Sequence, residues 1–205
     1  MFEAFILAGG QSARMEREKA LVQLNGESLV ERAVRTISKT GADQVTVLAG
    51  KKAGTLESHF KGIKVANDFS PDLGASGGIF TAIKNSGSEC VLVLACDLPF
   101  VTPQLITYLK VSFDKGGADA VVPMQPDKFK QPLCAFYRKS TCIVPFQAQL
   151  LRSELTPSAQ NLLSQIKTEF VDYEELAPFE GSADFFLNIN TPLDLESARE
   201  IARGK

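Results

Sequence analysis

A glycine-rich loop follows the first apolar run of the chain, and two basic residues lie beyond it. Gly9 and Gly10 carry no Cβ atoms, so their backbone N–H groups can approach a phosphate closely. Arg14 and Lys19 supply the fixed positive charge that a polyphosphate requires. A tight strand-to-helix turn with solvated charges is the alternative, and the two basic residues favour phosphate binding over it. The spacing fits neither the Gly-x-Gly-x-x-Gly fingerprint of dinucleotide-binding proteins nor the Gly-x-x-x-x-Gly-Lys-Ser/Thr loop of P-loop hydrolases.

Asp97 is a candidate ligand for a metal ion. It follows an apolar run at residues 91–95, which indicates a buried strand. An acid at the carboxyl end of such a strand points into the crevice where open α/β sheets bind ligands. A carboxylate there suits Mg²⁺, which takes one or two carboxylates together with phosphate oxygens and waters. Capping of the turn at Pro99 is the alternative role, and the clear strand favours the metal.

Residues 74–78 form a second glycine-rich stretch, with Gly74 and Gly78 at its ends. Three glycines in five residues before a helix let backbone groups meet a flat base or a ribose. A flexible connector is the alternative.

Two amides near the carboxyl terminus are candidates for binding a second substrate. Asn188 and Asn190 are two residues apart, so on a strand over residues 185–190 both amides would face the same side. Amides donate and accept hydrogen bonds, which suits a pterin or a phosphate. Asn190 has a second possible role, because it could help Thr191 to cap the last helix.

The elements that must position these residues follow from hydrophobic periodicity. Short apolar runs alternate with segments of helical period, which predicts an α/β fold with a mostly parallel sheet and helices on both faces. We expect strands at residues 2–7, 44–49, 64–66, 91–95 and 118–123, with weaker strands at 133–137 and 170–171, one of them antiparallel. We expect helices at residues 29–39, 103–113, 192–203, 76–85, 141–151 and 158–167, the first three from capping signals.

Composition excludes several classes of protein. A chain of 205 residues with a net charge of −2 predicts one globular domain and argues against a broad surface for nucleic acid. The four cysteines have no Cys-x-x-Cys spacing and are expected to be buried, reduced thiols. The first residues do not resemble a signal peptide and no apolar run is long enough to span a membrane, so we expect a cytoplasmic location. His59, the only histidine, is expected at the surface.

Four stretches that cover nearly the whole chain resemble molybdenum cofactor guanylyltransferases, within the wider sugar-nucleotidyltransferase-like fold. The stretches are Leu7-Ala8-Gly9-Gly10-x-Ser12-x-Arg14-Met15 with Lys19, Asn67-Asp68 followed by Gly74-Ala75-Ser76-Gly77-Gly78-Ile79, Ala95-Cys96-Asp97-Leu98-Pro99, and Asn188-Ile189-Asn190-Thr191-Pro192. The resemblance implies a three-layer, Rossmann-like nucleotidyltransferase fold in one domain over residues 1–205. It also implies GTP and molybdopterin as substrates, and contacts with other proteins of molybdenum cofactor biosynthesis.

The same resemblance implies a role for each candidate residue. The phosphate of molybdopterin attacks the α-phosphorus of GTP and pyrophosphate leaves. Arg14, Lys19 and Asp97 are then catalytic, and Asp97 holds Mg²⁺. Asn188 and Asn190 face the acceptor. The nucleotide is bound by Leu7, Ala8, Gly9, Gly10, Ser12, Arg14, Lys19, Asp68, Gly74 and Gly78.

Two alternatives remain open at this point. Ala75 and Ser76 replace the proline and leucine of the family's second loop, which leaves room for a related transferase that uses CTP or a cobinamide or sugar phosphate acceptor. Glu16 stands where the family has a glycine, and its charge near a triphosphate leaves room for a nucleotide-binding regulatory protein without turnover.

Overall fold

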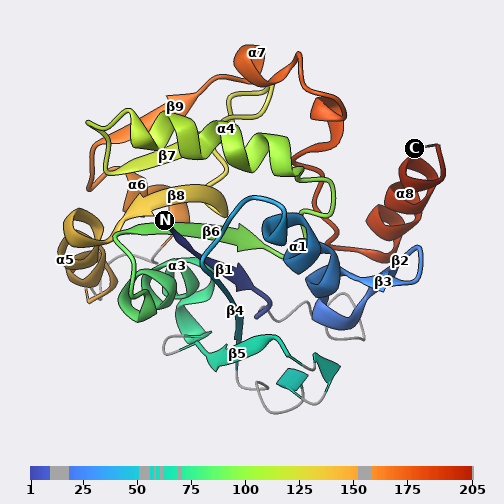
Figure 1. Cartoon of the computed structure of the whole chain (residues 1–205), viewed down its shortest axis with the longest axis horizontal. Coiled ribbons are helices and arrows are strands. Elements are labelled where there is room, and N and C mark those ends of the chain that lie inside the picture. The colour runs from blue at the N-terminus through green and yellow to red at the C-terminus, as the bar shows by residue number, and fades with distance from the viewer. Residues whose placement is uncertain are drawn as a thin grey trace.

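The protein, described here from a computed structural model, is built on a twisted sheet with helices on both faces (Figure 1). The structure describes residues 1–9, 19–50, 56–57, 59–60, 62–68, 71–151 and 158–204. Seven strands in this part of the chain form the sheet in the order β5-β4-β1-β6-β8-β7-β9. Their bounds are β1 Glu3–Leu7, β4 Gln44–Ala49, β5 Lys64–Asn67, β6 Cys90–Ala95, β7 Ala120–Pro123, β8 Cys134–Arg138 and β9 Thr168–Val171.

The strand directions confirm the predicted mostly parallel sheet. β1 pairs in parallel with both β4 and β6, β4 with β5, and β7 with β9. β8 runs antiparallel to its two neighbours, β6 and β7. The antiparallel direction therefore belongs to the strand predicted at residues 133–137, and the strand predicted at 170–171 is parallel.

Two hydrophobic cores pack against opposite faces of the sheet, as side-chain alternation along the strands requires. On β1, Ala4 and Ile6 belong to one core, whereas Phe5 and Leu7 belong to the other. The first core is covered by α1 (Leu29–Ser38) and α4 (Pro103–Asp114), the second by α3 (Gly74–Asn85), α5 (Lys139–Leu150) and α6 (Ala159–Leu163). Two further helices, α7 (Tyr173–Leu176) and α8 (Pro192–Arg203), complete the carboxyl-terminal part.

Helix starts predicted from capping residues are confirmed. Ser28 and Glu31 form a reciprocal capping box at the start of α1. Thr102 accepts a hydrogen bond from the backbone of Leu105 at the start of α4, and proline follows it. Thr191 does the same for Asp194 at the start of α8.

Three sequence predictions are corrected. The helix predicted at residues 158–167 is only α6, which ends at Leu163, because the backbone of Lys167 is bonded to Asp119 beside the sheet. The strand predicted at residues 185–190 is absent from this described segment, which follows a 3-10 turn, η3 (Ser182–Asp184), and packs along the Asp97 turn. Residues 74–78 are not a loop, because they form the first turns of α3.

A short hairpin precedes α1 and was not predicted. It consists of β2 (Gln23–Leu24) and β3 (Glu27–Ser28), joined by Asn25 and Gly26 at φ values of 54° and 84°. The Asn-Gly pair is the usual signal for this type of turn. Asn25 donates a hydrogen bond to the carbonyl of Ala202 on α8, which lies beside the hairpin in Figure 1.

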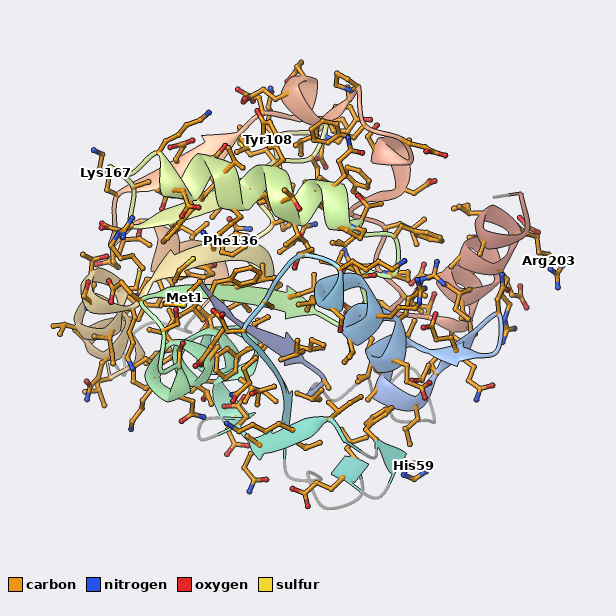
Figure 2. The ribbon with its side chains drawn as sticks, viewed as in Figure 1. Met1, His59, Tyr108, Phe136, Lys167 and Arg203 are labelled. Carbon is orange, nitrogen blue, oxygen red and sulfur yellow. The ribbon has the colours of Figure 1, made fainter. Side chains whose placement is uncertain are left out.

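The remaining expectations about burial are met by the described side chains. All four cysteines are buried and free. His59 is exposed and lies at the periphery, while Phe136 lies inside the molecule (Figure 2). In the described part of the chain, none of the helices has the length and apolar character needed to cross a bilayer.

Candidate active site

The candidate residues leave the sheet at one edge. Leu7 at the end of β1 is paired with Ala95 at the end of β6, and Ala49 at the end of β4 is paired with Asn67 at the end of β5. Gly9, Asp68 and Asp97 each follow one of these strand ends. Open α/β sheets bind ligands outside this edge.

Asp97 forms an ion pair with Lys19. The Lys19 Nζ atom lies 2.7 Å from Asp97 Oδ2, and the two side chains are 14% and 19% exposed. Lys19 begins a short 3-10 helix, η1 (Lys19–Leu21), whereas Asp97 follows the fully buried strand β6. The pair is thus largely shielded from water, and both side chains keep a small exposed fraction.

Asn190 completes this cluster from the other end of the chain. Its Oδ1 atom accepts a second hydrogen bond from Lys19 Nζ at 2.6 Å. Its backbone N–H donates to Asp194 Oδ2 at 2.8 Å, next to the capping box that starts α8. The capping role of Asn190 is therefore confirmed, because its backbone takes part in the helix cap, while its amide faces Lys19 and its acceptor role stays a prediction.

Backbone bonds hold the Asp97 turn against its neighbours. The Cys96 N–H donates to Leu7 O at 3.1 Å, which ties the turn to the end of β1. The Ile189 N–H donates to Asp97 O at 3.0 Å, which ties it to the segment before α8. These two bonds hold the end of β1 and the segment before α8 next to the Asp97 turn, although the three segments are far apart in the sequence.

Asn188 lies differently from Asn190. Its Nδ2 atom donates to the carbonyl of Phe186 at 3.2 Å, within its own turn. The strand over residues 185–190, on which the expectation of two amides facing one side rested, is absent. The acceptor role of Asn188 stays a prediction.

The amino-terminal side of the site depends on close backbone approach. Ala8 donates its N–H to Leu48 O at 2.9 Å, so the chain continues beside β4. A Cβ atom added to Gly9 would lie 2.9 Å from the backbone nitrogen of Gly50. Glycine at this position is therefore required by packing. Gly10, Ser12 and Arg14 lie outside the described residues.

Asp68 is held by a threonine that sequence reasoning missed. Its Oδ1 atom accepts a hydrogen bond from Thr81 Oγ1 at 2.6 Å, and Thr81 is fully buried on α3. Nothing in the spacing of the sequence links these two residues. A Cβ atom on Gly78, one turn before Thr81, would lie 2.8 Å from Leu7 Cδ1, so this glycine lets α3 pack onto the end of β1.

The metal ligands that the described residues offer suit an ion that binds together with the nucleotide phosphates. Among the described residues there is no group of three or more histidine, cysteine, aspartate or glutamate side chains arranged for a metal. Mg²⁺ needs fewer protein ligands, since phosphate oxygens and waters complete its shell, so Asp97 fits it. Burial, together with the charge of Asp97, raises the pKa of the neighbouring Cys96 thiol.

Comparisons with known proteins show the family and the fold of the chain. Residues 4–168 match the family described as the MobA-like NTP transferase domain. The chain is 31% identical over 197 residues to a probable molybdenum cofactor guanylyltransferase of Pelotomaculum thermopropionicum, covering 96% of this chain and 91% of the relative. It is equally similar, at 31% over 196 residues, to the protein of that name from Carboxydothermus hydrogenoformans, covering 96% and 94%. The solved molybdopterin-guanine dinucleotide biosynthesis protein A from Archaeoglobus fulgidus superposes with a TM-score of 0.85 at 28% identity, covering 100% of each chain.

Proposed function

Since the chain belongs to the MobA-like NTP transferase family, we propose that it transfers GMP from GTP to the phosphate of molybdopterin and releases pyrophosphate. The observation that carries the proposal is the meeting of Lys19, Asp97 and Asn190 at the ligand-binding edge of the sheet. Two phosphorylated substrates and a metal ion need a cation, a carboxylate and an amide. Lys19, Asp97 and Asn190 supply these groups from three separate segments.

The reaction is a substitution at phosphorus, so the residues contribute position and charge rather than a covalent intermediate. Lys19 is placed to hold the phosphates that leave as pyrophosphate, together with Arg14 and the backbone at Gly9 and Gly10. To do so, its ammonium group must turn from Asp97 toward the triphosphate. Asp97 then has an oxygen free to hold a metal.

Asp97 would hold Mg²⁺, which when bound offsets the negative charge that builds on the leaving oxygen. The carboxylate lies in the turn that directly follows the buried strand β6, at the edge of the sheet where the phosphates are expected. Asn190 is positioned to orient the acceptor, because its amide lies beside the same ammonium group.

The base is expected on the side of Asp68 and α3, together with Ala8 and the end of β1. Thr81 fixes the Asp68 carboxylate, so that carboxylate can accept hydrogen bonds from a base or a ribose in a defined direction. Gly74 is exposed at the start of α3 and carries no side chain that would obstruct a flat ring, whereas Gly78 acts through its packing against Leu7.

We also infer that residues 1–205 act as one domain, because the segments carrying Lys19 and Asn190 come from opposite ends of the chain. Its cytoplasmic location and its contacts with other proteins of molybdenum cofactor biosynthesis stay predictions.

Pyrophosphate release with GTP, CTP, ATP and UTP in turn, and with molybdopterin as acceptor, tests the proposal. We expect release with GTP only. A preference for CTP would assign the chain to a cytidylyltransferase. Nucleotide binding without release for any acceptor would instead indicate a regulatory protein.

A further inference from the structure

The turn that carries Asp97 is weakly defined by its own backbone. Two hydrogen bonds within it, from Leu98 N to Ala95 O and from Val101 N to Leu98 O, are both 3.4 Å long. Backbone hydrogen bonds are usually about 2.7–3.2 Å long. The position of the Asp97 carboxylate therefore depends on groups outside the turn.

Arg32 on α1 supplies one of those groups. Its Nε atom donates to the carbonyl of Pro99 at 2.7 Å, two residues after Asp97. Pro99 is buried, so its carbonyl requires a donor, and a guanidinium makes a stronger hydrogen bond than a neutral group. The same guanidinium lies over the ring of Phe100, 5.8 Å from its centroid. Arg32 therefore contacts two consecutive residues of the turn.

Arg32 is not engaged mainly by the nearest acid. Glu27 Oε2 lies 3.8 Å from Arg32, whereas both Glu27 oxygens are held by Arg35 at 2.8 and 2.9 Å. The Arg32 side chain is 22% exposed, and its burial lowers its pKa. Arg35 is 49% exposed and ties α1 to the hairpin, away from the Asp97 turn. Arg32 therefore contacts the Asp97 turn, whereas Arg35 on the same helix contacts Glu27 of the hairpin.

The segment that carries Arg32 also carries Lys19. The Val22 N–H donates to Lys19 O at 3.1 Å, and the Leu29 N–H donates to Val22 O at 3.0 Å. The first turn of α1 is fixed by its capping box. Residues 19–32 therefore contact the Asp97 turn at two places, through Lys19 at the Asp97 carboxylate and through Arg32 at the carbonyl of Pro99.

We propose that Arg32 is a positioning residue that sets the place of the Asp97 carboxylate through its hydrogen bond to the carbonyl of Pro99. This inference rests on the proposed function, in which Asp97 holds the metal that accompanies the nucleotide. In this proposal Arg32 acts through the turn and not through a contact with either substrate.

Arg32→Ala tests the proposal by two measurements. A displacement of about 1 Å can reduce turnover by about 100-fold, so we expect kcat to fall about 10- to 100-fold. Calorimetric titration with GTP at increasing Mg²⁺ should show weaker enhancement of binding by the metal, with unchanged affinity when Mg²⁺ is absent. Arg32→Lys, which keeps one donor, should recover part of both effects. Arg35→Ala is the matched control on the same helix and should leave the Mg²⁺ dependence unchanged.

A double substitution separates positioning from general destabilisation. If Arg32 acts through Asp97, Arg32→Ala should have no further effect on Mg²⁺-dependent binding in an Asp97→Ala background. An equal effect in both backgrounds would overturn the proposal, as would a lowered melting temperature with normal Mg²⁺ dependence. The binding measurement does not require turnover, so an active wild type with an unaffected Arg32→Ala variant refutes only the role of Arg32. A wild type that binds nucleotide without releasing pyrophosphate refutes only the proposed function, and one that binds no nucleotide refutes both.

Discussion

The two sides of the candidate site are built in different ways. On the side of Asp97, ionic and amide groups from three chain segments contact each other directly, at 2.6 and 2.7 Å. On the side of Asp68, the contacts of the described residues include a hydroxyl hydrogen bond to a carboxylate and the close packing of two glycines. Charge dominates the first side, and shape dominates the second. Substitutions should therefore affect chemistry on the first side and nucleotide binding on the second.

Asp97→Ala should have the largest effect. Loss of the group that holds the metal is expected to reduce kcat by about 10³-fold, comparable with removal of a strong electrostatic contact in other active sites. The melting temperature should also fall, because Lys19 is only 14% exposed and loses its charged partner, but this loss of stability does not explain a thousandfold loss of turnover in folded protein. Steady-state kinetics with a thermal melt of the same sample measure both. A variant that retains more than a tenth of the activity contradicts the metal role.

Lys19→Met should be the next most severe substitution. It keeps the length of the side chain but removes the charge that contacts both Asp97 and Asn190, so we expect kcat/KM to fall about 10²-fold. Lys39→Met, on an exposed lysine at the end of α1, is the control and should behave as wild type. Unchanged nucleotide affinity and turnover in Lys19→Met would remove the phosphate role of this residue.

Gly9→Ala tests the close approach of backbone on the second side. The new Cβ atom would lie 2.9 Å from the Gly50 nitrogen, so the backbone must shift. Overpacking of this kind costs about 1–3 kcal/mol in the free energy of unfolding, and the loop at the nucleotide should move with it. Urea denaturation and GTP titration measure the two effects. Gly204→Ala, whose Cβ would meet its nearest atom at an ordinary 3.7 Å, is the control.

Thr81→Val should have the smallest effect on turnover. It removes the hydrogen bond to Asp68, which is worth about 1 kcal/mol, so KM for GTP should rise about fivefold while kcat stays near wild type. Thr81→Ser keeps the hydroxyl and should preserve KM. A fall in kcat with unchanged KM would place Asp68 on the chemical side of the site rather than the base side.

The sequence predicts well those elements that local signals specify. Capping residues at Ser28, Thr102 and Thr191 locate three helices to within a residue or two, because a cap acts through neighbouring backbone groups. The buried strand before Asp97 is equally clear, since six consecutive residues of β6 are buried. The approximate place of Asp97 at the sheet edge follows from it.

Features that depend on distant contacts were not predictable in the same way. Lys19 and Asn190 are separated by 171 positions, so no local pattern indicates that they meet. The same holds for Arg32 and Pro99, and for Thr81 and Asp68. The segment over residues 185–190 has the alternation of a strand but packs beside the Asp97 turn, because its backbone pairs with Asp97 rather than with the sheet.

Transfer of a label from the α-phosphate of GTP to molybdopterin tests the central claim most directly. With wild-type protein and Mg²⁺, we predict a labelled molybdopterin-guanine dinucleotide together with an equal amount of unlabelled pyrophosphate, and formation of the labelled product about 10³-fold slower with Asp97→Ala. Label that stays on free nucleotide while GTP is bound, or that passes to molybdopterin equally well in Asp97→Ala, would contradict the account.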